Sequence, residues 1–205
     1  MKPETGNNSV SADVRKVSVR IESGGHSFSV DALPKLAFDE NAAVEFVVIT
    51  HKTVLVPDEL FDEAAAGDFL AVAGLPCAAG EKPLCIPDEG CTAVAAVSAE
   101  CLSEIARQFG PRARFVSPMV MRSQSAGRRL HIRTFGKVSY FNLWDEGRLR
   151  LAEAFVTADA DEILYYVCGL DRNFGLGEYH IYIYGDSADE TAKLLKRYFK
   201  NVKCE

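Results

Sequence analysis

The alternation of hydrophobic and polar residues follows the same course twice along the chain, once from Val17 and again from Arg129. In each half, two alternating runs flank a turn that contains glycine, and a third apolar run and a helical pattern follow. The paired runs are Val17–Ile21 with Ser27–Val30, and Leu130–Arg133 with Val138–Leu143. A period of two across such a turn is typical of a β-hairpin. We therefore predict two sibling domains that face each other across a cleft.

The first half continues with two runs rich in β-branched residues, Val44–Ile49 and Thr53–Val56, which predict strands. Pro57 begins a predicted helix that continues to Ala66, because proline is tolerated in the first turn and the acids after it favour the positive end of the helix. Residues 67–90 hold four glycines and three prolines. We predict that this stretch is a long surface insertion.

A strand, a helix and a short strand complete the first half. Thr92–Val97 has the composition of a buried strand, and Ser98 after it is a good N-cap residue. Apolar residues then recur at helical spacing until Gly110, which is followed by proline and ends the predicted helix. Arg114–Val116 is the predicted last strand.

The second half has the same order of elements with clearer signals. Arg148–Val156 and Tyr179–Tyr184 are the predicted third and fourth strands, and a helix follows each of them. The predicted N-terminal capping pairs are Asp159 with Glu162, and Ser187 with Glu190. The last helix is expected to end among basic residues near Lys200, which favour its negative C-terminal end.

Composition places the chain among ordinary globular proteins. Its 205 residues are 48% hydrophobic and 25% charged, enough for one core or two small ones. No apolar run reaches the roughly 20 residues that span a bilayer. Residues 1–13 are polar and lack the apolar region of a signal peptide, so we expect a disordered lead and a cytoplasmic protein. The six cysteines form no C-x-x-C pair, which favours structural roles over metal binding.

The order βββαβα, given twice, resembles the ribonuclease H-like unit, and its duplication resembles the actin, sugar-kinase and chaperone ATPase superfamily. Three stretches are similar to a bacterial family of unknown function assigned to that superfold: Arg20–Ser29, Leu55–Phe61 and Gly136–Leu151. The resemblance implies an α/β protein made of two tandem units with mixed five-stranded sheets. The expected subdomains are residues 14–120, with the insertion at about 67–90, and residues 121–205.

The resemblance also implies where a nucleotide would bind. In the superfamily each hairpin carries an Asp-x-Gly turn, in which backbone amides approach phosphate and the acid organises a hydrated metal ion. The matching turns here are Glu22-Ser23-Gly24 and Thr134-Phe135-Gly136, and a glycine of the adenosine-binding turn matches Gly185. The implied cleft and phosphate-binding residues are Glu22, Ser23, Gly24, Gly25, Thr134, Gly136, Lys137 and Gly185.

The second turn has lost the acid that this chemistry needs. Thr134 adds no negative charge to hold Mg²⁺, and Arg133 and Lys137 beside it would repel the metal. We therefore expect no catalytic residue, no metal site and no cofactor. The expected function is that of a noncatalytic scaffold or protein-interaction module. The alternative is a nucleotide- or phosphate-binding protein, a degenerate ATPase that takes ATP and Mg²⁺ in the cleft.

Charge is distributed unevenly. Between Glu104 and Asp145 there are eight basic residues and no acid, whereas the rest of the chain has 15 basic and 29 acidic residues. The candidate basic surface comprises Arg112, Arg114, Arg122, Arg128, Arg129 and Arg133; the competing interpretation is that most of these side chains point separately into solvent or neutralise neighbouring acids. A pI of about 5.3 disfavours nucleic acid. We expect a protein partner and no membrane, and a homodimer stays open.

Overall fold

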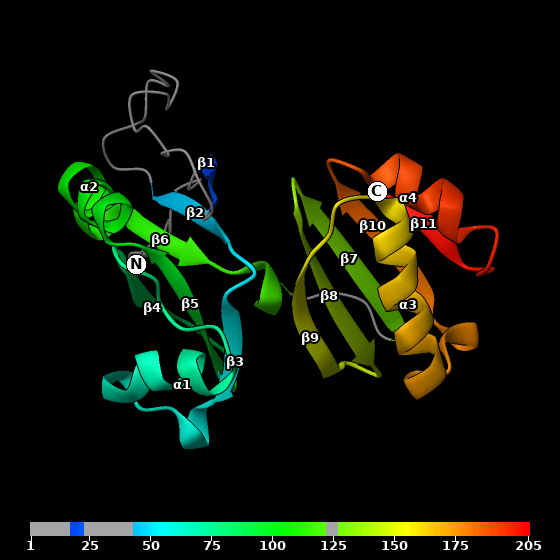
Figure 1. The fold of residues 1–205 in the computed structure, drawn as a ribbon, viewed down its shortest axis with the longest axis horizontal. Helices are drawn as coiled ribbons and strands as arrows, with labels where there is room; N and C mark the ends of the chain where they lie inside the picture. Colours follow the sequence, from blue (N-terminus) through cyan, green and yellow to red (C-terminus); the bar gives the residue numbers. More distant parts are fainter. Residues whose placement is uncertain (1–16, 23–42, 122–126) are drawn as a thin grey trace, which may run out of the picture.

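The computed structural model describes residues 17–22, 43–121 and 127–205, the first range by its backbone alone, and these residues form two lobes (Figure 1). Residues 17–22 and 43–121 belong to the first lobe, and residues 127–205 to the second. The predicted strand Ser27–Val30 lies outside the described residues. Both lobes combine helices with sheets, so the α/β class is confirmed.

Within the described residues, the first lobe contains two three-stranded sheets. One sheet is parallel and has the order β1 (Val17–Glu22), β2 (Val44–Ile49) and β6 (Ala113–Val116). The other is antiparallel and has the order β3 (Thr53–Pro57), β5 (Cys91–Ser98) and β4 (Glu81–Asp88). The expected first unit has one mixed five-stranded sheet. In the described residues, the parallel strands and the antiparallel strands form two separate sheets instead.

The core of the first lobe forms on both faces of β5, which explains why this strand is a continuous apolar run. Ala93, Ala95 and Val97 pack with α2 (Ala99–Phe109), whereas Val94 and Ala96 pack with α1 (Ala66–Val72). Ser98 caps α2 as predicted: its Oγ accepts a hydrogen bond from the Cys101 amide at 3.3 Å.

Two predictions in this lobe are wrong. The helix expected at Pro57–Ala66 is two 3-10 turns, Asp58–Leu60 and Glu63–Ala65, because the extended backbone at Phe61 separates them. The expected insertion at 67–90 contains all of β4 and nearly all of α1. Proline had argued against a strand there, but β4 is an edge strand, where a missing amide hydrogen need not break a ladder bond.

The second lobe has one mixed sheet with the order β11-β10-β7-β8-β9. These strands are β7 (Arg129–Phe135), β8 (Val138–Asp145), β9 (Arg148–Val156), β10 (His180–Gly185) and β11 (Val202–Cys204). β7, β8 and β9 are antiparallel neighbours, and β10 runs parallel to both β7 and β11. Two helices, α3 (Ala160–Phe174) and α4 (Ala188–Leu195), pack with inward strand residues such as Leu130 and Ile183.

The capping pairs have different outcomes. Asp159 Oδ1 accepts from the amides of Asp161 and Glu162, and Glu162 in turn accepts from Ala158, so the first helix start is confirmed. Ser187 makes no side-chain cap, and this prediction is wrong because its backbone amide instead donates to Thr134 Oγ1. The last helix ends at Leu195 instead of Lys200, and the three-residue strand β11 follows it.

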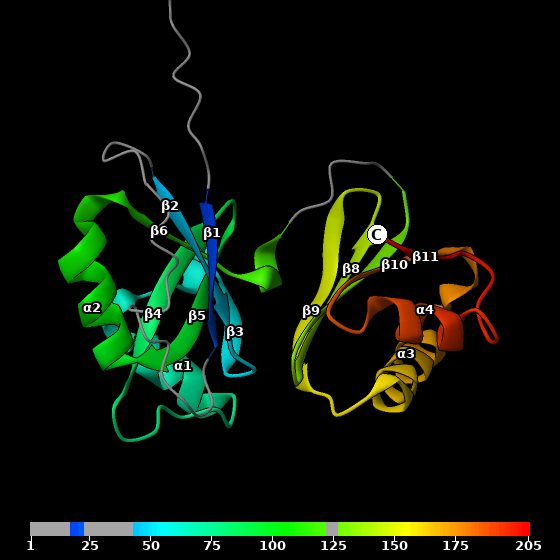
Figure 2. The ribbon, with the colours of Figure 1, turned by 90° about the horizontal axis from the view of Figure 1, so that it is seen from above.

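The second lobe turns the helix-free face of its sheet toward the first lobe, and α3 and α4 lie on the far side (Figures 1 and 2). The fully buried Tyr140 of β8 reaches across: its hydroxyl donates to the Thr50 carbonyl at 2.9 Å and accepts from the Thr50 amide at 2.7 Å. Asn142 Nδ2 donates to the Met119 carbonyl at 2.8 Å. The lobes therefore meet through a packed junction made of β2, β8 and the 3-10 turn Pro118–Val120.

Candidate functional site

The ends of β7 and β10 bring together three residues expected at the phosphate site, Thr134, Gly136 and Gly185. Because the two strands are parallel neighbours, their carboxyl ends lie at the same edge of the sheet. The buried Thr134 hydroxyl donates to the Tyr184 carbonyl at 3.1 Å and accepts from the Ser187 amide at 3.2 Å. Thr134 therefore fastens one strand end to the other.

Gly185 is required by this close approach. Its φ is +101°, and a Cβ at this position would lie 2.0 Å from the Thr134 carbonyl oxygen. That oxygen also accepts a hydrogen bond from the Asp186 amide at 3.1 Å. A side chain at residue 185 would therefore clash with backbone, in addition to the strain of a positive φ.

The Gly136 amide has a partner within the chain. It donates to Asp186 Oδ2 at 3.0 Å. In the turn where the resemblance places phosphate, a carboxylate of the chain itself thus accepts the amide hydrogen that an anion would take. Asp186 also puts a negative charge beside any approaching phosphate. Sequence reasoning missed this acid; the signal was its position directly after Gly185.

Two other residues of the expected site, Lys137 and Glu22, lie within the described ranges. Lys137 follows the turn, and its carbonyl accepts from the Thr157 amide at 2.8 Å. Glu22 is the last residue of β1 and pairs with Ile49. Ser23, Gly24 and Gly25 lie outside the described residues. The structure therefore describes the geometry of the second turn, residues 134–136, and not that of the first.

The described residues of the candidate basic surface are divided between the two lobes. Arg112 and Arg114 belong to the first lobe, where the Arg112 guanidinium lies 5.9 Å from the Phe109 ring centroid. Arg122 lies outside the described residues. Arg128 in the second lobe forms ion pairs with Asp145 and Glu178.

Two of these arginines lie on one face, the helix-free face of the second sheet. Arg129 and Arg133 alternate with His131 along β7, opposite Tyr182 and Tyr184 of β10. The His131 ring stacks on both tyrosine rings, at centroid distances of 5.2 and 5.7 Å. Arg129 lies 5.8 Å from the Tyr182 centroid, and Arg133 lies 5.2 Å from that of Tyr184. The result is a layered array of rings and cations.

Electrostatics fix the charge state of this array. Burial, together with the neighbouring charges of Arg133 and Arg129, lowers the pKa of His131 to about 4. Burial also raises the pKa of Tyr184 to about 12. At neutral pH both rings are therefore uncharged, and the positive charge of the array is carried by its arginines.

Residues 17–22, 43–121 and 127–205 contain no group of three or more His, Cys, Asp or Glu side chains placed to hold a metal ion. In the same ranges, no helix has the length and apolar character needed to cross a membrane. All six cysteines are free thiols, and burial raises the pKa of Cys85 and Cys101.

Comparisons with known proteins bear on the fold. No protein-family model matches this chain, and no curated protein matches it. A Bacteroides thetaiotaomicron protein described as having an actin-like ATPase fold and unknown function is similar, with a TM-score of 0.67 and 15% identity over 80% of this chain and 68% of that one. The PilM–PilN type IV pilus biogenesis complex gives a TM-score of 0.45 and 12% identity over 80% of this chain and 69% of that one. A Ppx/GppA family member from Aquifex aeolicus gives 0.28 and 12%, over 48% and 41%. The first likeness shows that the chain has the actin-like ATPase fold.

Proposed function

We propose that this protein is a noncatalytic protein-interaction module built on the actin-like ATPase fold. The observation that carries the proposal is the hydrogen bond from the Gly136 amide to the Asp186 carboxylate. A phosphate that entered this turn would have to displace the carboxylate or accept its repulsion. Thr134, bonded to Tyr184 and Ser187, offers no charge to replace the acid that a hydrated Mg²⁺ would need.

The architecture supports the same proposal at a finer level. In the second lobe three antiparallel strands are followed by a helix and a parallel strand, and β7 lies in the middle of the sheet. This order favours a ribonuclease H-like unit for residues 121–205. The first lobe, residues 14–120, is then a divergent partner unit whose parallel and antiparallel strands form separate sheets. A fold of this kind can be retained as a scaffold after its chemistry is lost.

Thermal unfolding with and without ligand tests the proposal. Wild-type protein should keep its melting temperature in ATP with Mg²⁺, in ADP and in inorganic phosphate. Bound ligand at 100 times its Kd would add about 2.7 kcal/mol, which is roughly 5–11 °C for a protein of this size.

Variants distinguish the two functions. A saturable rise in melting temperature that weakens in Lys137→Ala would support the degenerate ATPase instead and overturn the proposal. Asp186→Asn keeps the shape of the turn and removes its negative charge. If this variant responds to phosphate and the wild type does not, the carboxylate is what excludes the anion.

A further inference from the structure

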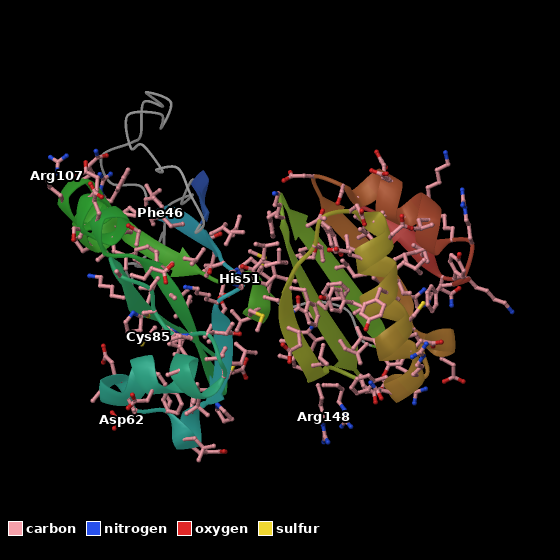
Figure 3. All side chains as sticks on the ribbon, in the orientation of Figure 1. Phe46, His51, Asp62, Cys85, Arg107 and Arg148 are labelled. Atoms are coloured by element: carbon pink, nitrogen blue, oxygen red, sulfur yellow. The ribbon has the colours of Figure 1, made fainter. Side chains whose placement is uncertain are left out.

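A groove of about 700 Å³ lies between the two lobes beside their junction. One wall is β3 with the turn and helix that follow it, and the other is the middle of β9; Met119 also lines the groove. Figure 3 shows His51, which also lines the groove, where the lobes meet, with Asp62 at the lower edge of the first lobe and Arg148 at the lower edge of the second. The groove is distinct from the β7–β10 turn described above.

The groove gathers exposed apolar side chains. Leu60 is 69% exposed and Val72 is 90% exposed, and both line it on the first lobe. On β9, Ala152 and Ala154 line the opposite wall, and the exposed Val156 continues the same face at a spacing of two. Single apolar residues on a surface are ordinary, but their concentration in one hollow marks an interaction site.

Both walls also offer an open strand edge. β3 is the outer strand of its sheet, and β9 is the outer strand of the sheet in the second lobe. Within the described ranges, each of the two pairs with one neighbour, β5 and β8 respectively. The backbone groups on the free side of such a strand can pair with an added strand.

Charge selects the kind of segment that fits. From residue 53 to residue 81 there are six acids and no lysine or arginine. Three of them are exposed beside residues that line the groove: Asp58 and Glu59 lie between Pro57 and Leu60, and Asp68 precedes Phe69. Glu153 on β9 also lines the groove, and burial raises its pKa. The rim that the first lobe forms is therefore acidic, whereas β9 carries two exposed cations, Arg148 and Arg150.

We propose that this groove binds an extended segment of a partner protein that is apolar at alternate positions, carries lysine or arginine around them, and adds a strand to the β3 edge. Alternate side chains of such a strand enter the hollow against Val72 and Leu60, while its basic residues meet the acidic rim. This proposal rests on the proposed function, because it names the kind of partner that the interaction module takes.

The probe is a phage library of random 12-residue peptides, selected on the full-length protein. Enriched sequences should be apolar at alternate positions and net positive. Synthetic peptides from the selection should bind Val72→Asp at least about tenfold more weakly, because the variant loses an apolar contact and places a charge in the hollow. Tyr165→Asp is the matched control, because Tyr165 is 75% exposed on α3, away from the groove. This variant should bind the peptides with the affinity of the wild type.

Further measurements keep the test decisive. Circular dichroism and melting temperature verify that Val72→Asp is folded, as its exposed position predicts. Peptide should slow amide exchange in β3 and leave β11 unchanged. No enriched family, enriched peptides that are acidic, or equal binding to Val72→Asp would overturn the proposal. A dimer abolished by Val72→Asp would assign the groove to a second copy and overturn it as well. Peptide binding by a protein that also binds ATP would refute the proposed function and leave the groove intact.

Discussion

Removing the Tyr140 hydroxyl should destabilise the whole protein. Tyr140→Phe keeps the ring in place but deletes the group that bonds both the amide and the carbonyl of Thr50. Both residues are fully buried. Burial raises the pKa of Tyr140 well above its ordinary value, so the hydroxyl remains a donor across the working pH range.

The size of the effect follows mainly from the Thr50 amide, which is left without a partner, whereas the Thr50 carbonyl keeps the hydrogen bond from Thr53 Oγ1 at 3.0 Å. A buried donor that loses its hydrogen bond costs about 1–3 kcal/mol and the lost bond to the carbonyl about 0.5–1.5 kcal/mol, so the variant should lose about 2–4 kcal/mol. For a chain of this length, that is a drop in melting temperature of roughly 4–16 °C. The loss exceeds the cost of about 1 kcal/mol that is typical of a mutation, because this one hydroxyl bonds two main-chain groups at the junction.

Urea unfolding at pH 7, followed by circular dichroism, measures the change. Tyr165→Phe is the control, because its hydroxyl belongs to an exposed side chain and its loss should change the free energy of unfolding by less than about 0.5 kcal/mol. If Tyr140→Phe is as stable as this control, the hydroxyl does not hold the lobes together and the reasoning is refuted.

Two further changes test other parts of the structure. His131 has a pKa of about 4 in the folded protein and about 6.5 in the unfolded chain. Its contribution to the free energy of unfolding should therefore be complete above pH 6.5 and fall by up to roughly 3 kcal/mol as the pH drops toward 4. His131→Gln should flatten that part of a curve of stability against pH, and an unchanged curve would contradict the assignment. Gly185→Ala should lower the free energy of unfolding by roughly 2–4 kcal/mol, because the added Cβ would clash with the Thr134 carbonyl. Gly147 also has a positive φ, but a Cβ there would have no atom within 4 Å, so Gly147→Ala should cost roughly 1 kcal/mol. Equal losses in chemical denaturation would show that backbone strain alone accounts for the effect.

The local pattern of hydrophobic and polar residues was sufficient to predict most helices and strands of the second lobe. Alternation with a period of two located β9 at its observed bounds, and Asp159 marked the start of α3. Such signals lie within a few neighbouring residues, because each strand buries one face and each helix must satisfy its first amides. The short strand β11 carried too few residues to give such a signal.

The pattern did not predict which distant segments of the chain pair with each other. β4 contains two prolines and was predicted as part of an insertion, yet its position at a sheet edge makes them acceptable. We expected β2 to be the third strand of a unit like the second lobe, where the third strand, β9, pairs antiparallel with β8. β2 instead pairs with β1 in parallel. Alternation predicts that a strand exists; which strand lies beside it depends on how the whole lobe packs.

The candidate site divides in the same way. The sequence by itself determined that Thr134 stands where the superfamily that the chain resembles has an acid, and that Gly136 and Gly185 are at strand ends. Only the tertiary structure decided that Asp186 accepts the Gly136 amide and that β3 and β9 face each other across a groove. The physical reason is distance along the chain: Gly136 and Asp186 are 50 residues apart, and only the parallel pairing of β7 and β10 brings them into contact.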